Sequence, residues 1–556
     1  MKLYEGIASA LIDEGCETMF GVMGDGNMTL WAAIGAQGRI DLRSARHEAA
    51  AVAMADGYFR ATGKTGVATV TYGPGLTQTA TSLIASLRNR TPLVLIVGDF
   101  ARSDTTNIQH FDHAPFVESC GIRYLRASGL PNVAKEMAQA FHWARVRREP
   151  VVFGIPVDLL DASLDWGFDY VPASIGAEPP IASAPRDAID ALARRLMQAR
   201  QAVLIAGLGA RQAGAREPIR RLAAQAGCLL ATTLKAKGLF SDDAFDLGIV
   251  GTYSSRPAED LMAEADLVVG FGAELGYLTT EGGLLFPDAE VVLIDRVAVP
   301  EKLPFLSAEY IAGDACEAAR ALHEACSALG QAREGARNAQ TLARLGQPYP
   351  APALPTDGID PRELARQLSG LIPADARVVV GVGHYWGFFM MYTALPHGVD
   401  ALYSYQMGAI GQTLFIGLGA ALAEPSRRHI VIDGDGSLLM SLQELETAAR
   451  YRLPMTVLVW NDLGYGAEVH KLKAKGLDDS LARWSDTTDF AAVARAFGGD
   501  GAVVTRLDQF ADAMRRSLAS DSLFVIDVRV SPSIKTDAYL KLHFGIENQA
   551  PSLRKI

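Results

Sequence analysis

Short apolar runs alternate with helical patterns along much of this chain, most clearly toward its C-terminal end. An apolar run over 430–432 ends in a Gly-Asp-Gly turn at 434–436, and a helical pattern follows from Ser437 to Tyr451. A proline ends that helix, and a second apolar run leads to Asn461. Such a pattern is typical of two buried parallel strands joined by a helix. Because parallel strands bind ligands at their carboxyl ends, we expect Asp435 and Asn461 to lie close together.

The same layout occurs a second time, in residues 66–99, where a strand, a glycine turn, a helix, a proline and a strand follow one another. Two similar units predict two copies of one parallel-sheet fold. The middle of the chain also alternates strands and helices, with apolar runs at 202–210, 265–273 and 291–297. The predicted fold class is α/β: three doubly wound parallel-sheet domains, the first and third being related.

Two proline-rich segments, 171–186 and 346–360, divide the chain of 556 residues, a length that suits about three domains. The expected units are a first domain, a central Rossmann-like domain, a third domain and a polar C-terminal tail, over residues 1–168, 187–340, 360–535 and 536–556. In the central block Gly207 and Gly209 resemble a dinucleotide-binding loop, but a lone Gly-X-Gly is a weak signal and a structural role is favoured.

Composition and charge narrow the class of protein. The sequence is 49% hydrophobic and 21% charged, and its formal net charge of −11 argues against nucleic-acid and anionic-membrane binding. Its five cysteines show no metal or disulfide spacing. The run from Leu414 to Leu422 is too short to span a bilayer. The N-terminal segment reads as an amphipathic helix with acidic residues rather than a signal peptide, so we expect a cytoplasmic protein.

The Gly-Asp-Gly turn and the downstream Asn carry the candidate chemistry. An Asp carboxylate, an Asn amide oxygen and a main-chain carbonyl are hard ligands suited to Mg²⁺ or Ca²⁺. Gly436 permits a close backbone approach, and a helix N-terminus with Ser437 as its N-cap favours phosphate oxygens. An ordinary strand-to-helix turn is the alternative. The Asn placed one strand–helix–strand unit later favours a metal-and-diphosphate site.

This segment resembles the cofactor motif of thiamine-diphosphate (ThDP) enzymes, a Gly-Asp-Gly followed by Asn-Asn. Here the second Asn is Asp462, a departure. The resemblance covers essentially the whole chain and implies ThDP and Mg²⁺ as cofactors. It assigns the metal to the residues Asp435, Asn461 and the main-chain oxygen of Leu463. It assigns cofactor contacts to Glu48, Gly75, His384, Tyr385, Gly408, Ile410, Gly434, Gly436 and Ser437.

Glu48 opens an Ala-rich helical pattern in RHEAAAVAMADGYFRATGK, which closely resembles the ThDP enzymes' segment with the Glu that shares a proton with N1′ of the cofactor's pyrimidine. Burial of this helix should favour the shared-proton state, while a Glu that complements the helix dipole is the structural alternative. In this family the first domain of one subunit meets the third domain of another. The resemblance therefore implies an obligate homodimer, and we expect a homotetramer.

Three local matches concern the substrate side. The segment FGVMGDGN resembles the active-site strand end of pyruvate decarboxylase-type enzymes and places Asp25 on their Asp. The segment NDLGYGAEV places Glu468 on their active-site Glu. Where those enzymes have an active-site loop with two adjacent histidines, this chain has His110 and His113, which are separated by two residues. Each of these could instead be a hydrated loop residue.

The main functional prediction is a ThDP- and Mg²⁺-dependent C–C bond lyase acting on a small 2-oxo acid or aldehyde, foremost a 2-oxo acid decarboxylase that can also carboligate. The alternatives are an acetolactate synthase-like acyloin synthase, a 2-hydroxyacyl lyase, or, in another class, a degenerate non-catalytic ThDP-fold subunit. Acetolactate synthases resembling this chain hold FAD partly through a segment of the type GVRFDDR. Residues 272–280 here read GAELGYLTT, so we expect no FAD.

Overall fold

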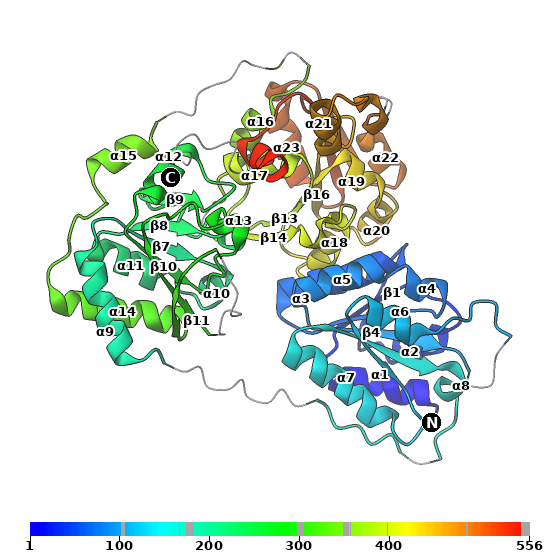
Figure 1. The fold of residues 1–556 in the computed structure, drawn as a ribbon. Coiled ribbons are helices and arrows are strands. Elements are labelled where there is room, and N and C mark those ends of the chain that lie inside the picture. Colours follow the sequence, from blue (N-terminus) through cyan, green and yellow to red (C-terminus); the bar gives the residue numbers. More distant parts are fainter. Residues whose placement is uncertain are drawn as a thin grey trace.

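The computed structural model describes residues 1–101, 106–165, 167–173, 183–296, 305–347, 355, 357–396, 398–484 and 488–545. Three six-stranded sheets lie within them, and neighbouring strands are parallel throughout (Figure 1). This confirms the predicted fold class. Many of the strands, such as β4 and β16, are buried along their whole length, which is why they read as continuous apolar runs rather than alternating ones.

The first domain has the strand order β2-β1-β3-β4-β6-β5. Its strands are β1 (Thr18–Gly21), β2 (Asp41–Ser44), β3 (Gly66–Val70), β4 (Leu93–Asp99), β5 (Arg123–Arg126) and β6 (Pro150–Pro156). Its helices are α1 (Leu3–Asp13), α2 (Met28–Gln37), α3 (Glu48–Thr62), α4 (Pro74–Thr77), α5 (Ala80–Arg88), α6 (His113–Ser119), α7 (Val133–Arg147) and α8 (Val157–Leu160).

The third domain has the equivalent order β14-β13-β15-β16-β18-β17, so the repeat seen in the sequence corresponds to a repeated fold. Its strands are β13 (Arg377–Gly381), β14 (Asp400–Ser404), β15 (His429–Gly434), β16 (Met455–Asn461), β17 (Asp500–Val504) and β18 (Phe524–Arg529). Its helices are α16 (Pro361–Ser369), α17 (Tyr385–Tyr392), α18 (Thr413–Ala423), α19 (Asp435–Leu439), α20 (Glu444–Arg450), α21 (Gly466–Ala474), α22 (Phe490–Ala496), α23 (Phe510–Ala519) and α24 (Asp537–Phe544).

The central domain has the order β12-β11-β10-β7-β8-β9, the arrangement of a Rossmann fold. Its strands are β7 (Ala202–Ala206), β8 (Leu229–Thr232), β9 (Asp246–Ile249), β10 (Leu267–Phe271), β11 (Glu290–Asp295) and β12 (Glu309–Ala312). Its helices are α9 (Arg186–Gln198), α10 (Leu208–Gln212), α11 (Arg216–Ala226), α12 (Arg256–Ala263), α13 (Tyr277–Thr280), α14 (Ala315–Leu329) and α15 (Ala339–Leu345).

The Gly-X-Gly of the central domain lies at the topological switch point between β7 and β10. Gly209 N–H donates to the Gly272 carbonyl oxygen at 3.0 Å, and a side chain at Gly207 would collide with that same oxygen. These glycines therefore let two strand ends pack backbone to backbone, which supports a structural role for the Gly-X-Gly rather than a role in nucleotide binding.

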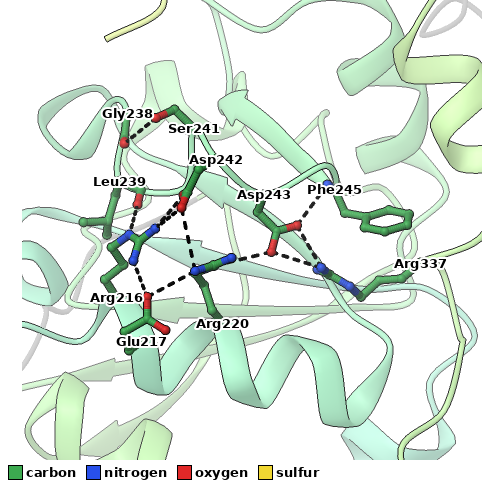
Figure 2. Close-up of polar contacts among 10 residues, drawn as sticks. All are labelled: Arg216, Glu217, Arg220, Gly238, Leu239, Ser241, Asp242, Asp243, Phe245 and Arg337. Atoms are coloured by element: carbon green, nitrogen blue, oxygen red, sulfur yellow. Dashed lines mark hydrogen bonds and ion pairs between the residues drawn. The ribbon is translucent and has the colours of Figure 1, made fainter. Parts of the chain in front are cut away.

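One cluster of charged side chains on the central domain is paired internally (Figure 2). The Asp243 carboxylate binds Arg337 Nη2 at 2.8 Å and lies 3.5 Å from Arg220 Nε, while Asp242 pairs with Arg216. Because each of these cations faces a carboxylate, the network ties α11 to the loop after β8 and to the segment before α15. It does not present a free cationic surface.

Two differences from the sequence expectations concern helices. The helix expected over 437–451 begins earlier, at Asp435, and is divided into α19 and α20 by a turn over 440–443. Ser441 Oγ donates to the Leu438 carbonyl oxygen at 3.3 Å, a local bond that competes with helix continuation. The range expected to be a tail contains α24, with Lys541 and Tyr539 buried.

The first and third domains meet where α3 crosses α18. A side chain at Gly57 would collide with the carbonyl oxygen of Ile416, and one at Gly419 would collide with that of Met54. The two contacts are reciprocal, because α3 and α18 occupy equivalent places in the two domains. Both glycines are needed for the backbones to approach so closely, and the core around them is continuous from one domain to the other.

Among the described residues, no helix has both the length and the apolar character that crossing a membrane requires.

We predict that Gly57→Ala destabilises the protein by about 1–3 kcal/mol, because the added methyl group forces the two helix backbones apart. Urea unfolding of the full chain measures this. The matched control is Gly35→Ala in α2, where an added Cβ would lie an ordinary 3.6 Å from Leu42 Cδ1. The control should be neutral or stabilising by up to about 1 kcal/mol. Equal effects of the two changes would show that the crossing imposes no constraint.

Candidate functional site

A pocket opens at the carboxyl ends of β13, β15 and β16, where the sequence predicts a ligand site. The described residues that line it all belong to the third domain: Pro361, Val382, Gly383, His384, Tyr385, Phe388, Ile410, Gly434, Asp435, Gly436, Ser437, Trp460, Asp462, Gly464, Tyr465, Gly466, Ala467, Glu468, Val530 and Ser531. The parallel pairing of β15 with β16 brings the Gly-Asp-Gly turn beside the loop that follows Asn461.

Two carboxylates are buried side by side in this pocket. Burial, reinforced by the charge of Asp462, raises the pKa of Asp435 well above its ordinary value, and burial also raises the pKa of Asp462. Gly464 N–H donates to Asp435 Oδ2 at 3.2 Å. Raised pKa values mean that the two carboxyls ionise together only with difficulty, and a bound divalent cation would favour their ionised form, so these oxygen donors fit a metal ion. Among the described residues, those of this pocket included, no three His, Cys, Asp or Glu side chains gather around one point, so a metal here would also need amide or main-chain oxygens as ligands.

The Asn461 amide is held in one orientation. Its Nδ2 donates to Asp527 Oδ1 at 2.9 Å, and its Oδ1 accepts from Leu463 N–H at 3.2 Å. Leu463 itself has φ +58°, a left-handed conformation that is unusual for a leucine. Sequence reasoning missed Asp527. Its signal in the sequence is an acidic residue with apolar neighbours on both sides in strand β18.

The Gly-Asp-Gly turn opens α19, with Gly434 as the N-cap residue instead of the expected Ser437. Ser437 lies inside the helix, and its Oγ accepts from Gly411 N–H at 2.8 Å. This bond ties the turn to the segment that carries Ile410, whose half-buried side chain lines the pocket. Gly408, with φ +68°, lies in the same segment but does not line the pocket.

His384 and Tyr385 lie on the other side of the turn, at the start of α17. Tyr385 Oη donates to Asp433 Oδ1 at 3.1 Å, so this hydroxyl supports the strand end while the ring forms pocket wall. Burial lowers the pKa of His384 to about 4, which keeps its imidazole neutral. His384 Nδ1 lies 3.3 Å from Asp462 Oδ2. The family departure at residue 462 is therefore matched by a histidine that can donate to the carboxylate.

Of the predicted substrate-side residues, Glu468 lines the pocket. It is exposed and pairs with Lys471 Nζ at 3.2 Å, one helical turn away on α21.

The predicted residues of the first domain do not line the pocket. Glu48 is the half-buried first residue of α3, and Asp25 is exposed in a turn that Asn27 closes by accepting from Gly24 N–H at 2.8 Å. Gly75 is buried against Thr71, whose Cγ2 would lie 2.8 Å from an added Cβ. The segment before Glu48 does contact the third domain, since Arg46 N–H donates to Glu444 Oε1 at 2.7 Å.

The two predicted histidines have different environments. His113 is buried, accepts from Gly73 N–H through Nε2 at 3.4 Å, and places Nδ1 3.5 Å from Asp99 Oδ1. Burial lowers its pKa. His110 is exposed, with its ring 4.8 Å from that of Phe100. In this chain His113 is therefore buried within the first domain, whereas His110 is exposed.

Comparisons with known proteins agree with this geometry. Residues 1–118, 189–322 and 381–528 match the family models of the N-terminal TPP binding domain, the central domain and the C-terminal TPP binding domain of thiamine pyrophosphate enzymes. Thiamine pyrophosphate is another name for ThDP.

Full-length relatives cover nearly the whole chain. An acetolactate synthase large subunit of Parasynechococcus marenigrum is 30% identical over 94% of this chain and 87% of its own length. A probable 2-ketoarginine decarboxylase of Pseudomonas aeruginosa is 30% identical over 94% of each chain. The isozyme 2 large subunit of Escherichia coli acetolactate synthase is 29% identical over 94% of each. With three matching domain models in the order observed here, this chain belongs to the family of thiamine pyrophosphate enzymes.

Proposed function

We propose that this protein is a ThDP- and Mg²⁺-dependent carboligase of the acetolactate synthase type, which joins the acyl part of a decarboxylated 2-oxo acid to a second carbonyl compound. The observation that carries the proposal is the similarity to acetolactate synthases along the whole chain. This reverses the order of the sequence-based interpretations, in which simple decarboxylation came first and acyloin synthesis second.

The site residues have separate tasks in this proposal. Asp435, Asn461 and the Leu463 carbonyl would hold Mg²⁺, and the turn at Gly434–Ser437 would bind the diphosphate through its backbone N–H groups. When bound, ThDP supplies the carbon nucleophile and electron sink for cleaving a bond next to a carbonyl. Glu48 would hold the shared proton at N1′. FAD has no part in this proposal, in line with the segment at 272–280.

Release of an aldehyde requires a proton donor within hydrogen-bond reach of the reacting carbon. Of the four candidates, Asp25, His110, His113 and Glu468, only Glu468 lines the pocket within one chain. The other three belong to the first domain, which a partner chain would contribute in the dimer proposed below. Decarboxylation to an aldehyde remains the second candidate function, because a 2-ketoarginine decarboxylase is among the 30% identical relatives.

Reaction stoichiometry tests the proposed function. The purified protein with ThDP and Mg²⁺ is given 2-oxo acids singly and in pairs, while CO₂, aldehyde and 2-hydroxy ketone products are measured by mass spectrometry. Carboligation consumes two molecules of 2-oxo acid for each CO₂ and leaves no aldehyde. Simple decarboxylation gives one CO₂ and one aldehyde for each 2-oxo acid and would refute the proposal in favour of the second candidate.

A partner chain would complete the site. Apolar side chains are exposed around the carboxyl edges of both ThDP domains: Met23, Met28 and Ile108 in the first, and Met407, Leu439, Met440 and Tyr465 in the third. Ile108 is 100% exposed, an unfavourable state for an isoleucine that a second chain would relieve. We therefore propose a homodimer in which Glu48 of one chain faces the pocket of the other, with a tetramer as the larger assembly.

We predict that Asp435→Asn strongly weakens ThDP binding, because it removes the anionic metal ligand. Replacing a residue that only supports a metal ligand costs roughly 10- to 100-fold in affinity, and the loss here should be larger. Calorimetry in Mg²⁺ measures the change, and excess Mg²⁺ should restore part of the affinity. The exposed Asp521→Asn serves as the control and should bind ThDP as the parent does. Unchanged and EDTA-insensitive binding in Asp435→Asn would exclude this metal site.

Mixing two inactive variants tests the shared site. Glu48→Gln alone should keep ThDP binding but lose activity on the order of 10²–10⁴-fold, the usual worth of general acid–base catalysis. After mixing and subunit exchange with Asp435→Asn, half of the dimers are mixed, and each mixed dimer has one intact site. About a quarter of the parent activity should therefore return. No recovery, after mass spectrometry has shown mixed dimers, would place both residues in one chain's site.

A further inference from the structure

A buried lysine connects the last helix of the third domain to the central domain. Lys541 on α24, the red helix of Figure 1, is 3% exposed. Its ammonium group binds the Glu259 carboxylate and lies 2.7 Å from Glu281 Oε1. Glu259 belongs to the first turn of α12, and Glu281 directly follows α13. The cluster therefore spans the boundary between two domains.

The cluster is unlike a surface ion pair. Burial works against the ammonium group, but the two carboxylates outweigh it and raise the pKa of Lys541 above its ordinary value. Burial raises the pKa of Glu259 to about 7. A second cation, Arg256 Nη1, lies 3.8 Å from the Glu259 carboxylate. Glu281 is 1% exposed and has φ +52°, a left-handed conformation that is strained for a glutamate. Removing one partner from such a buried group is strongly unfavourable.

Other residues of α24 contact the wall of the pocket. Tyr539 Oη donates to the Ala467 carbonyl oxygen at 2.6 Å, and its ring centroid lies 5.3 Å from that of His384. The N-cap residue Thr536 packs so closely on α17 that an added Cβ at Gly387 would lie 2.5 Å from its hydroxyl oxygen. Both Ala467 and His384 line the pocket. Helix α24 is therefore held between the central domain and two of the elements that form the site.

We propose that Lys541 is a positioning residue for the cofactor pocket: by pairing with Glu259 and Glu281 it holds α24 against α17 and α21, and so keeps the wall formed by His384 and Ala467 in place. The central domain thereby acts on the site through α24. The effect on the cofactor rests on the proposed use of this pocket for ThDP, whereas the docking of α24 does not.

Lys541→Met tests the anchor, since methionine keeps most of the side-chain length but removes the cation that Glu259 and the buried Glu281 share. In the full-length protein without cofactor, amide hydrogen exchange over 537–544 should be at least about tenfold faster than in the parent, as expected for local opening. The dissociation constant for ThDP with Mg²⁺ should rise by about tenfold as well. Lys541→Arg, which retains the positive charge, should restore both quantities toward the parent values.

The exposed Lys475→Met, the same change in the same domain, is the matched control and should alter neither quantity. Unchanged exchange in Lys541→Met, or failure of Lys541→Arg to restore it, would overturn the anchoring role. Faster exchange with unchanged ThDP affinity would overturn the positioning role.

The experiment distinguishes failure of the proposed function from failure of the proposed role of Lys541. If the parent itself does not bind ThDP, the proposed function fails, while the exchange data still decide whether Lys541 anchors α24. If Lys541→Met does not fold, Glu281→Gln takes its place. It leaves the Lys541–Glu259 pair intact, and the two quantities should then change in the same direction by smaller factors.

Discussion

The close crossing of α3 and α18 determines how the two related domains of this chain are joined. Because Gly57 and Gly419 each face a carbonyl group of the opposite helix, the two backbones are in direct contact. Around the crossing, Ser82 Oγ lies 2.7 Å from Gln412 Oε1 and 2.8 Å from the Ala49 carbonyl oxygen. The start of α3, where Glu48 lies, is thus fixed against the segment that follows Ile410. The reciprocal form of the contact follows from the duplication, since equivalent helices meet in equivalent ways.

The two domains share a strand order but differ at the edge that binds ligands. In the first domain the end of β4 is closed: Asp99 binds Arg126 and Tyr124, and an added Cβ at Gly73 would lie 2.8 Å from Gln109. In the third domain the end of β16 is open, and its Asn461 is oriented by Asp527. A loop therefore covers this edge in the first domain, while the same edge of the third domain forms a pocket with two buried carboxylates, so two copies of one fold differ at the place where such sheets bind ligands.

Sequence patterns within a few residues predicted the strands and the turn that carry the pocket. Apolar runs located β15 and β16, and the Gly-Asp-Gly turn with Asn461 located the pocket, because strand order and turn chemistry are encoded within a few residues. Contacts between distant segments were not accessible in this way. The burial of His113 depends on Asp99 and on the backbone at Gly73, and the support of Asn461 comes from Asp527. The docking of α24 depends on carboxylates more than 250 residues away in the sequence.

The central domain shows how such a fold can serve a site that it does not line. Its Gly-X-Gly loop is occupied by its own backbone, with Gly209 bound to Gly272, so the place where a Rossmann fold receives a nucleotide is used for packing. Arg216 on α11 and the nearby Arg337 are paired with Asp242 and Asp243 of the same domain. Its buried Glu281 and half-buried Glu259, in contrast, share a cation from another domain. Since a buried carboxylate is costly without a partner, Lys541 links the burial of Glu281 in the central domain to the position of α24 in the third.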